Sequence, residues 1–399
     1  MTDNNENKVL NVPHLRFPEF SGEWEIYPLT DFMSFKNGMN PDAKRFGRGT
    51  KFISVMDILN NQFICYDNIR ASVEVVDGDI ETYGVNYGDI LFQRSSETLE
   101  DVGQANVYLD SKPAVFGGFV IRGKSKSNYY PMFFRYLLAS PTARKKIIVK
   151  GAGAQHFNIG QDGLSKVCLN IPSIQEQEKI AKLFECIDTR IATQNKIIEK
   201  LETLIKGIVE LAFSHAATSN TLGCYITQIS QRNKTGKDLP VLSVSNKHGF
   251  VEQSEQFEDR IIASDDTSNY KIVDINDFAY NPARINVGSI ARLKDKECGI
   301  VSPMYICFRT SKDILPEYLE LFFKTVTFSF EVGKRLEGSV RLCLSYESLC
   351  EIVIPIISIR EQQSLVKMVT TFHSKLDVEK GFLSSYQSQK QCLLSQMFI

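Results

Sequence analysis

Two long amphipathic stretches, residues 175–213 and 360–398, constrain the fold of this chain more than any other feature of its sequence. In the first, apolar residues recur in alternating steps of four and three, the spacing of the a and d positions of a coiled coil: Ile180, Phe184, Ile187, Ile191, Ile198, Leu201 and Ile205. A shift of 185 residues yields a second series: Leu365, Val369, Phe372, Leu376, Leu383, Tyr386 and Leu393. One such stretch is typical of a long core helix. Two stretches at matched register predict two helices that pack against each other.

The repeat extends beyond these stretches. With the same shift, positions 102–213 align with positions 287–398 without a gap, whereas the offset drifts further upstream. Matched pairs include Val102-Gly103 with Val287-Gly288, Pro131 with Pro316, and Gly153 with Gly338. Glycines in turns and prolines at helix starts are hard to replace, because few other residues adopt their backbone conformations. The chain is therefore expected to run in the order domain, long helix, domain, long helix.

The starts of the long helices also match. Each follows an Ile-Pro pair, at Ile171-Pro172 and Ile354-Pro355, so we expect proline to end the preceding strand and a serine to cap the helix. A polar residue interrupts each apolar series at the same place, and we expect Gln194 and Glu379 to set the register. Short β-branched and aromatic runs fill the rest of each repeat. The sequence predicts an α+β fold with two pseudo-repeated α/β domains, separated by two long antiparallel coiled-coil helices.

Composition restricts the class of protein. A length of 399 residues with 43% hydrophobic content suffices for two or three domains. The first residues lack the pattern of a secretion signal, and no apolar run approaches the roughly 18–20 residues that cross a bilayer. We therefore expect a cytoplasmic protein that does not enter a membrane. The nine cysteines form no C-x-x-C pair and the five histidines lie at no ligand spacing, so we expect reduced thiols and no metal site.

Enzyme motifs are weak. The tetrapeptide Asn281-Pro282-Ala283-Arg284 is similar to a motif of amino-methyltransferases, but arginine replaces the aromatic residue that would stack on a base. The glycines of Gly151-Ala152-Gly153 are typical of a turn, because the equivalent second-half stretch carries a glutamate that would repel phosphate. We expect a chain without catalytic residues of its own.

Basic clusters recur in both halves. Arg144, Lys145, Lys146 and Lys150 precede the loop with Gln155 and His156, and Lys334, Arg335 and Arg341 occupy the corresponding region of the second half. One such cluster is typical of a solvated surface, but its recurrence beside polar loops indicates phosphate contacts flanked by residues that read base edges. Arg94, and Arg284 with Asn286, follow buried strands. Either arginine would then contact DNA or would be structural, paired with a buried carboxylate.

The sequence resembles a known family over its whole length. The opening VPHLRFPEFSGEWEIYPL, the stretch GAGAQHFNIGQDGLSKVCLNIPSIQEQEKIAKLF, its counterpart EGSVRLCLSYESLCEIVIPIISIREQQSLV and the final LLSQMF are similar to the specificity (S) subunits of type I restriction-modification systems. The second copy departs from the pattern, because Val340-Arg341 stands where the first copy has Gln155-His156. The two loops are therefore not expected to make identical contacts.

The resemblance implies two target recognition domains, each reading one half of a split, asymmetric DNA sequence. They would occupy residues 1–172 and 215–355, with spacer helices at 173–214 and 356–399. It also implies two methylation and two restriction subunits as partners, which would use S-adenosylmethionine, ATP and Mg²⁺; this chain would bind no cofactor. A helix of about 39 residues is about 58 Å long, and half-sites one turn apart are separated by about 34 Å.

Two other classes of protein remain. A scaffold with two lectin-like or peptide-binding domains on a coiled-coil strut would show no sequence-selective DNA binding, even with partner subunits. A fragment of a fused restriction-methylation enzyme would need a catalytic domain, and the sequence shows none.

Overall fold

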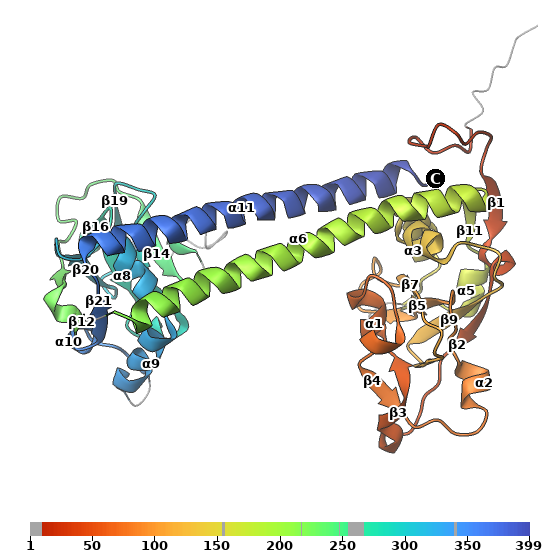
Figure 1. Cartoon of the computed structure of the whole chain (residues 1–399), viewed down its shortest axis with the longest axis horizontal. Coiled ribbons are helices and arrows are strands. Elements are labelled where there is room, and N and C mark those ends of the chain that lie inside the picture. Colours follow the sequence, from red (N-terminus) through yellow and green to blue (C-terminus); the bar gives the residue numbers. More distant parts are fainter. Residues whose placement is uncertain (1–9, 154–155, 217, 247, 254–266, 339–340) are drawn as a thin grey trace, which may run out of the picture. The chain divides into compact units, whose positions relative to one another are not determined.

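The computed structural model describes residues 10–153, 156–216, 218–246, 248–253, 267–338 and 341–399 (Figure 1). The chain forms two compact units. Unit 1 comprises Met1–Asn195 and Gly381–Ile399, and unit 2 comprises Lys196–Lys380. The two long helices, α6 (Ile174–Ser214) and α11 (Ile359–Gln396), begin and end within two residues of the predicted stretches. Each helix contributes one part to each unit, and the units are described separately.

Unit 1 is an α+β unit around an antiparallel sheet. Its strands are β1 (Glu25–Pro28), β2 (Met33–Asn37), β3 (Phe46–Ile53), β4 (Ala71–Val73), β5 (Ile90–Gln93), β6 (Ser95–Ser96), β7 (Ala105–Val107), β8 (Val115–Phe116), β9 (Val120–Ser125), β10 (Phe157–Asn158) and β11 (Cys168–Ile171). The main sheet has the order β2-β9-β5-β7, a second sheet has the order β4-β3-β8, and β1 pairs with β11 and β6 with β10. The shorter helices are α1 (Val55–Asn60), α2 (Asp79–Tyr83), α3 (Pro131–Ala139), α4 (Pro141–Ile148) and α5 (Gln161–Ser165). Every residue of β5 is buried, as its apolar sequence predicts.

Unit 2 repeats this main sheet. Its strands are β12 (Thr218–Thr221), β13 (Ile226–Ile229), β14 (Val241–Ser245), β15 (Gly249–Glu252), β16 (Lys271–Asp274), β17 (Phe278–Tyr280), β18 (Ile290–Arg292), β19 (Cys298–Val301), β20 (Ile306–Thr310) and β21 (Val353–Ile356). The orders are β13-β20-β17-β18 and β15-β14-β19-β16, and β12 pairs with β21. The shorter helices are α8 (Pro316–Phe322), α9 (Val326–Arg335) and α10 (Tyr346–Cys350). The α+β class with two repeated units is confirmed.

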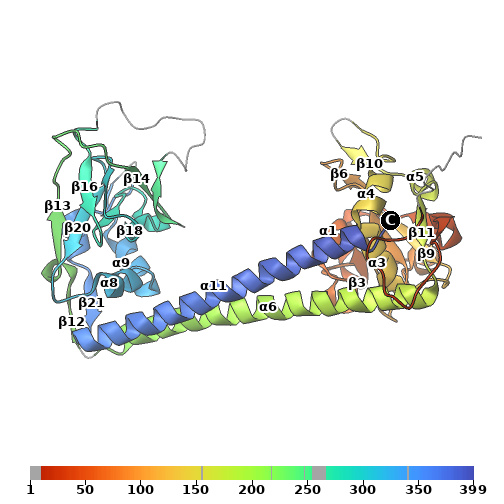
Figure 2. The same ribbon diagram turned by 90° about the horizontal axis from the view of Figure 1, so that it is seen from above.

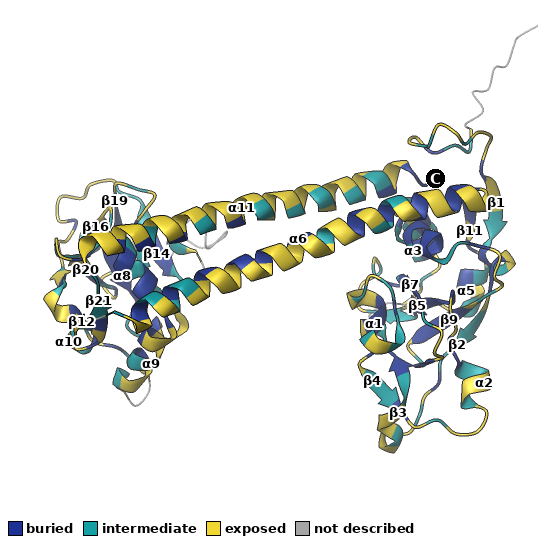
Figure 3. Ribbon diagram, viewed as in Figure 1, coloured by how far each residue is buried: buried dark blue, intermediate teal, exposed yellow. Residues whose placement is uncertain are grey.

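All seam positions of both long helices are buried or half-buried (Figure 3). Those that are buried are Ile180, Phe184, Ile187, Ile198, Leu201, Ile205, Leu365, Val369 and Leu376, and those that are half-buried are Ile191, Phe372, Leu383, Tyr386 and Leu393. In unit 1, Phe184 contacts Phe398, and Asp188 pairs with Lys390. Residue numbers therefore rise along α6 where those of its partners fall. In unit 2, Glu202 pairs with Lys380. The two helices are therefore packed together in antiparallel directions within unit 1.

Both long helices carry in their first turn a buried glutamine that binds the backbone just before α3 or α8 of the same unit. In unit 1, Gln177 accepts a hydrogen bond from the Tyr130 N–H at 3.0 Å and donates to the Pro172 carbonyl at 3.0 Å. In unit 2, Gln362 accepts from the Leu315 N–H at 2.9 Å and donates to the Ile357 carbonyl at 3.0 Å. Each accepted bond fixes the residue before the first proline of α3 or α8. The repeated glutamine is thus a structural residue.

The expectation for the Ile-Pro pairs is wrong in one copy. The hydrogen bonds of the two glutamines place Ile357, not Pro355, at the position of Pro172. Pro355 lies inside β21, where a two-stranded ribbon tolerates a residue without an N–H. The serine caps are present: the Glu176 N–H donates to Ser173 Oγ at 3.4 Å, and Ser358 forms a reciprocal pair with Glu361.

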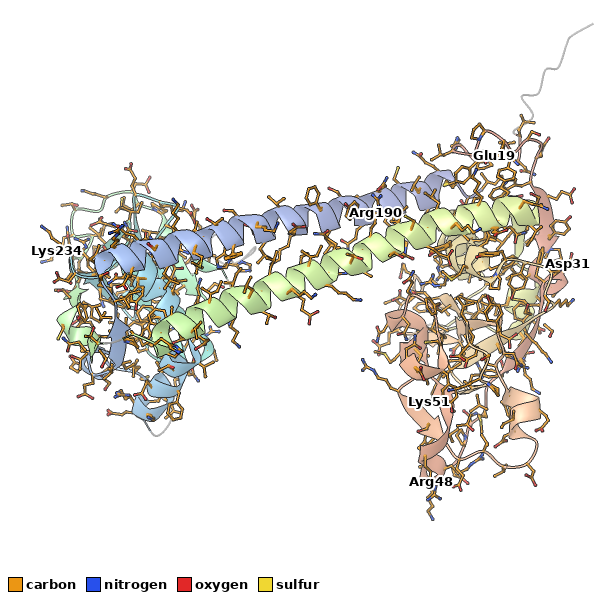
Figure 4. All side chains as sticks on the ribbon, in the orientation of Figure 1. Glu19, Asp31, Arg48, Lys51, Arg190 and Lys234 are labelled. Atoms are coloured by element: carbon orange, nitrogen blue, oxygen red, sulfur yellow. The ribbon has the colours of Figure 1, made fainter. Side chains whose placement is uncertain are left out.

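The N-terminal segment of the described residues lies against the end of the last helix. The Leu15 N–H donates to the Gln396 carbonyl at 3.0 Å. Arg16 binds both carboxylate oxygens of Glu176 at 2.7 Å, and Glu19 pairs with Lys179 beside the first turns of α6 (Figure 4). The segment therefore ties the start of α6 to the end of α11 within unit 1.

Candidate nucleic-acid interface

The structure brings two of the predicted loops of unit 1 together. Arg94 follows the buried strand β5, and the strand after it, β6, pairs with β10 just beyond His156. The Ile159 N–H donates to the Arg94 carbonyl at 2.9 Å, which closes this ribbon. Figure 2 shows β6, β10 and α4 next to one another in unit 1. The segment that follows Arg94 thus pairs with the segment that follows His156, although 62 positions separate the two residues in the sequence (156 minus 94).

A glycine permits the turn that carries His156. Gly153 has φ +146°, and a Cβ there would lie 1.9 Å from the His156 carbonyl oxygen. Gly338 in unit 2 has φ +127°, and a Cβ there would lie 2.3 Å from the Arg341 carbonyl oxygen. Each glycine therefore lies against the carbonyl of the residue three positions on, which leaves no room for a side chain in either unit. Gln155 and Val340 lie outside the described residues.

The side chain of Arg94 is half-buried, while that of His156 is exposed. The Arg94 guanidinium donates to the Gly118 carbonyl at 3.3 Å, and no carboxylate pairs with it among the described residues. The backbone of Arg94 also donates to the Phe119 carbonyl at 2.9 Å. The buried-carboxylate alternative for Arg94 is therefore not supported. The guanidinium keeps donors available for a ligand.

The cations on α4 and directly after it divide into two groups. Arg144 faces inward, where its guanidinium donates to the carbonyls of Glu100 at 2.8 Å and Val102 at 2.7 Å, and burial lowers its pKa. Arg144 is therefore a structural residue, not a surface cation as the sequence suggested. Lys145 and Lys150 are exposed, and Lys146 is half-buried, so that burial lowers its pKa. None of these three ammonium groups has an ion pair among the described residues, and they leave an uncompensated positive surface.

Unit 2 contains the same ribbon closure with different residues. The Leu344 N–H donates to the Pro282 carbonyl at 3.1 Å, as Ile159 does to Arg94. Pro282 therefore occupies the position of Arg94, and Arg284 stands further along a shorter loop. Arg284 and Asn286 are both exposed. The Arg284 guanidinium has no carboxylate partner in the described part of the chain, so its structural alternative is not supported either.

The basic cluster of unit 2 is partly neutralised. Lys334 and Arg335 both pair with Glu331, and these two contacts lower the pKa of the Glu331 carboxyl. The Lys334 ammonium also lies 4.2 Å from the centroid of the Phe330 ring. Arg341 is exposed beside the Gly338 turn. This cluster therefore offers less free positive charge than α4 of unit 1 does.

Sequence reasoning missed two residues near the Arg94 ribbon. Phe119 is 69% exposed next to the backbone of Arg94, beside an apolar cavity of ≈ 390 Å³. Lys166 is exposed after α5, and a Cβ added at Gly163 of α5 would lie 3.4 Å from Lys150. The pair Gly117-Gly118, which precedes Phe119, was the available sequence signal of a turn. These residues add an apolar contact and a cation to the same region.

Other kinds of site are not found in the described part of the chain. No group of three or more His, Cys, Asp or Glu side chains is placed to hold a metal ion there. All nine cysteines are free thiols, and no described helix is long and apolar enough to cross a membrane. The arrangement favours contact with a polyanion through α4 and the ribbon of β6 and β10.

Sequence comparisons agree with this arrangement. The family model described as type I restriction modification DNA specificity domain matches residues 21–203. A provisionally named MjaX specificity subunit of Methanocaldococcus jannaschii is 27% identical over 256 residues, which are 61% of this chain and 57% of the relative. The type I restriction enzyme EcoKI specificity subunit of Escherichia coli K12 is 23% identical over 51% of this chain and 46% of the relative. The chain thus spans about half the length of these curated relatives.

Solved structures show the same fold at low sequence identity. The S subunit of a type I restriction-modification system from M. genitalium has a TM-score of 0.54 and 16% identity, covering 97% of this chain and 99% of that one. A chain of a type I restriction-modification complex has a TM-score of 0.57 and 12% identity, covering 93% of this chain and 96% of that one. The HsdS subunit of Thermoanaerobacter tengcongensis has a TM-score of 0.50 and 13% identity, covering 93% and 95%.

Proposed function

The chain belongs to the family of type I restriction-modification specificity subunits, which are not themselves catalytic, and we propose that it reads a bipartite, asymmetric target in double-stranded DNA. Unit 1 reads one half of the target and unit 2 reads the other. The observation that carries this proposal is the lysine surface of α4 beside the ribbon of β6 and β10, where a cationic helix face adjoins exposed polar side chains. Phosphate contacts hold a protein in register on DNA, and neighbouring polar side chains read base edges.

The residues have separate roles in this proposal. Lys145, Lys146 and Lys150 contact phosphates, while Arg94, Gln155 and His156 read bases in unit 1. In unit 2, Arg341, Lys334 and Arg335 contact phosphates, and Arg284 and Asn286 read bases. Because Glu331 neutralises part of the second cluster, unit 1 contributes more of the electrostatic affinity.

We propose partners outside this chain for the chemistry. Two methylation subunits dock on the exposed faces of α6 and α11, and two restriction subunits complete the complex. S-adenosylmethionine, ATP and Mg²⁺ are used by those subunits. The long helices connect the two readers and keep the half-sites at a defined spacing.

An exchange of one reader tests the proposal. Residues 215–350 begin after α6 ends and stop at the end of α10, so both long helices remain intact. We expect a chain that carries the corresponding residues of a relative to change one half of the methylated site and to leave the other unchanged. Mapping methylated adenines in cells that contain the partner subunits measures this. A change in both halves, or in neither, contradicts the model of two readers.

The scaffold alternative predicts a different result. A chain that only binds proteins or sugars through its two units would show no sequence-selective DNA binding in the presence of the partner subunits. Binding competition between specific and scrambled duplexes separates the two functions.

A further inference from the structure

Unit 2 contains a cavity whose residues have no assigned part in DNA reading. It has a volume of ≈ 380 Å³ and lies between α6, α8 and α11. Ile205, Val209, Leu321 and Leu376 form its apolar wall, and His373 and Lys324 are among the polar residues at its rim. The pocket is half open to solvent, because Lys324 and His373 at its rim are exposed.

The equivalent place in unit 1 is filled by an aromatic side chain. Tyr136 of α3 stacks on Phe184 of α6 with ring centroids 4.9 Å apart and an interplanar angle of 28°. Its hydroxyl donates to Asp188 Oδ2 at 2.8 Å. The Lys390 ammonium of α11 pairs with Asp188 at 2.5 Å and lies 5.5 Å from the centroid of the Tyr136 ring. A phenol ring and its two polar partners thus complete the packing of unit 1.

The sequence repeat identifies which residues of unit 2 stand at the positions of these side chains. The offset of 185 residues places Leu321 at the position of Tyr136, Val369 at that of Phe184, and His373 at that of Asp188. Ile205 stands at the position of Lys390. Both stacked rings are therefore replaced by aliphatic side chains, while the position that accepts the phenol hydroxyl keeps a side chain able to accept a hydrogen bond. The counterparts of Tyr136, Asp188 and Lys390, which are Leu321, His373 and Ile205, all line the cavity.

We propose that this cavity binds the phenol ring of a small molecule, with its hydroxyl directed at His373 as that of Tyr136 is directed at Asp188. An enclosed apolar cavity of about 150 Å³ holds benzene, and this half-open pocket has more than enough room for a phenol ring. Burial, with the nearby Lys324, lowers the pKa of His373, so its imidazole is neutral at pH 7 and one ring nitrogen can accept the phenol O–H. The bound ring contacts α6, α8 and α11 together and stabilises their packing.

The test is a titration of the full chain with p-cresol, followed by ligand-observed NMR and by the melting temperature. We expect saturable binding and a rising melting temperature. Leu321→Tyr places in the cavity the ring that unit 1 has, and it should weaken binding by about tenfold or more. Leu211→Tyr is the matched control, because Leu211 is 59% exposed on α6 and does not line the cavity. It should bind p-cresol as the natural chain does.

Two further measurements remain informative if Leu321→Tyr does not fold. Crystals soaked with 4-iodophenol should show an anomalous iodine peak in the cavity. Toluene should bind more weakly than p-cresol, and His373→Leu should remove that preference. Three results would overturn the site. They are the absence of saturable binding, equal binding by the natural chain and a folded Leu321→Tyr variant, and an iodine peak found only outside the cavity. Equal affinity for toluene and p-cresol would overturn the role of His373.

Discussion

Removal of two lysines from α4 should change the salt dependence of DNA binding in a calculable way. Lys145 and Lys146 lie on α4 without an ion pair among the described residues, whereas Arg144 beside them is used by the fold. Alanine at 145 and 146 therefore removes two charges without disturbing a carboxylate partner. Since α4 keeps the buried Ala143 and Ile147, the double variant should fold normally.

The magnitude follows from counterion release. Each phosphate contact contributes about 0.9 to the slope of log affinity against log salt, so the loss of two contacts should reduce the slope by about 1.8. Between 50 and 200 mM salt, the difference in affinity between the natural chain and the variant should then shrink by about 12-fold. Fluorescence anisotropy with a specific and a scrambled duplex, with partner subunits present, measures both slopes. The affinity for both duplexes should fall by similar factors.

The matched control is Arg48→Ala. Arg48 is a surface arginine of β3 whose guanidinium pairs with Glu74 at 2.8 Å, and it has no part in the proposed interfaces, so its removal should leave the slope unchanged. An unchanged slope for the double variant would refute the assignment of phosphate contacts. A loss of discrimination between the duplexes with undiminished affinity would show that these lysines read bases instead.

Three further predictions concern particular residues. Gln362→Leu should lower the free energy of unfolding by about 2–4 kcal/mol, because the Leu315 N–H and the Ile357 carbonyl lose their partner inside the protein. A urea titration measures this. Gln363→Leu, at the exposed neighbouring position, should have little effect in the same titration. Gly153→Ala should weaken DNA binding, because its Cβ would clash with the His156 carbonyl. Gly207→Ala, in an open helical position, should instead raise the melting temperature, and the reverse pattern would exclude the turn as part of the interface. Burial lowers the pKa of Lys146, so this side chain loses its charge at a lower pH than an ordinary lysine does. The DNA affinity of the Lys146→Arg variant should therefore rise relative to that of the natural chain as the pH rises from about 8 to 10. A ratio of the two affinities that stays constant with pH would contradict a contact through this ammonium group.

Several features of the fold were predictable because they depend on local spacing. The alternating apolar steps around Phe184 and Val369 predicted both long helices within two residues at each end. The matched glycines at 103 and 288 have φ +70° and +85°, which is why no other residue replaced them in either repeat. The exposure of Lys145 and Lys150 also agreed with a solvated or polyanion-binding surface.

Other features depended on contacts that spacing does not specify. Arg144 and Lys145 are adjacent in one basic cluster, yet only the packing of Arg144 against the carbonyls of residues 100 and 102 makes it structural. In the sequence alone, an alignment of Arg94 with Arg284 is as plausible as one with Pro282. The hydrogen bond from Leu344 to Pro282 shows that the loop of unit 2 is shorter, so that proline takes the position of Arg94.

The sequence by itself determined that the chain contains a repeated α+β domain and two long helices of matched register, because helix periodicity and turn residues are written in neighbouring positions. Only the tertiary structure decided which helix end completes which unit. Phe398, at the end of the chain, packs on Trp24 and Phe133 of unit 1, whereas Phe213, its counterpart at the end of α6, packs on Tyr318 and Phe322 of unit 2. The sequence repeats therefore exchange their helix ends, since an aromatic residue is buried by whichever core lies beside it in space and not by the one nearest in the chain.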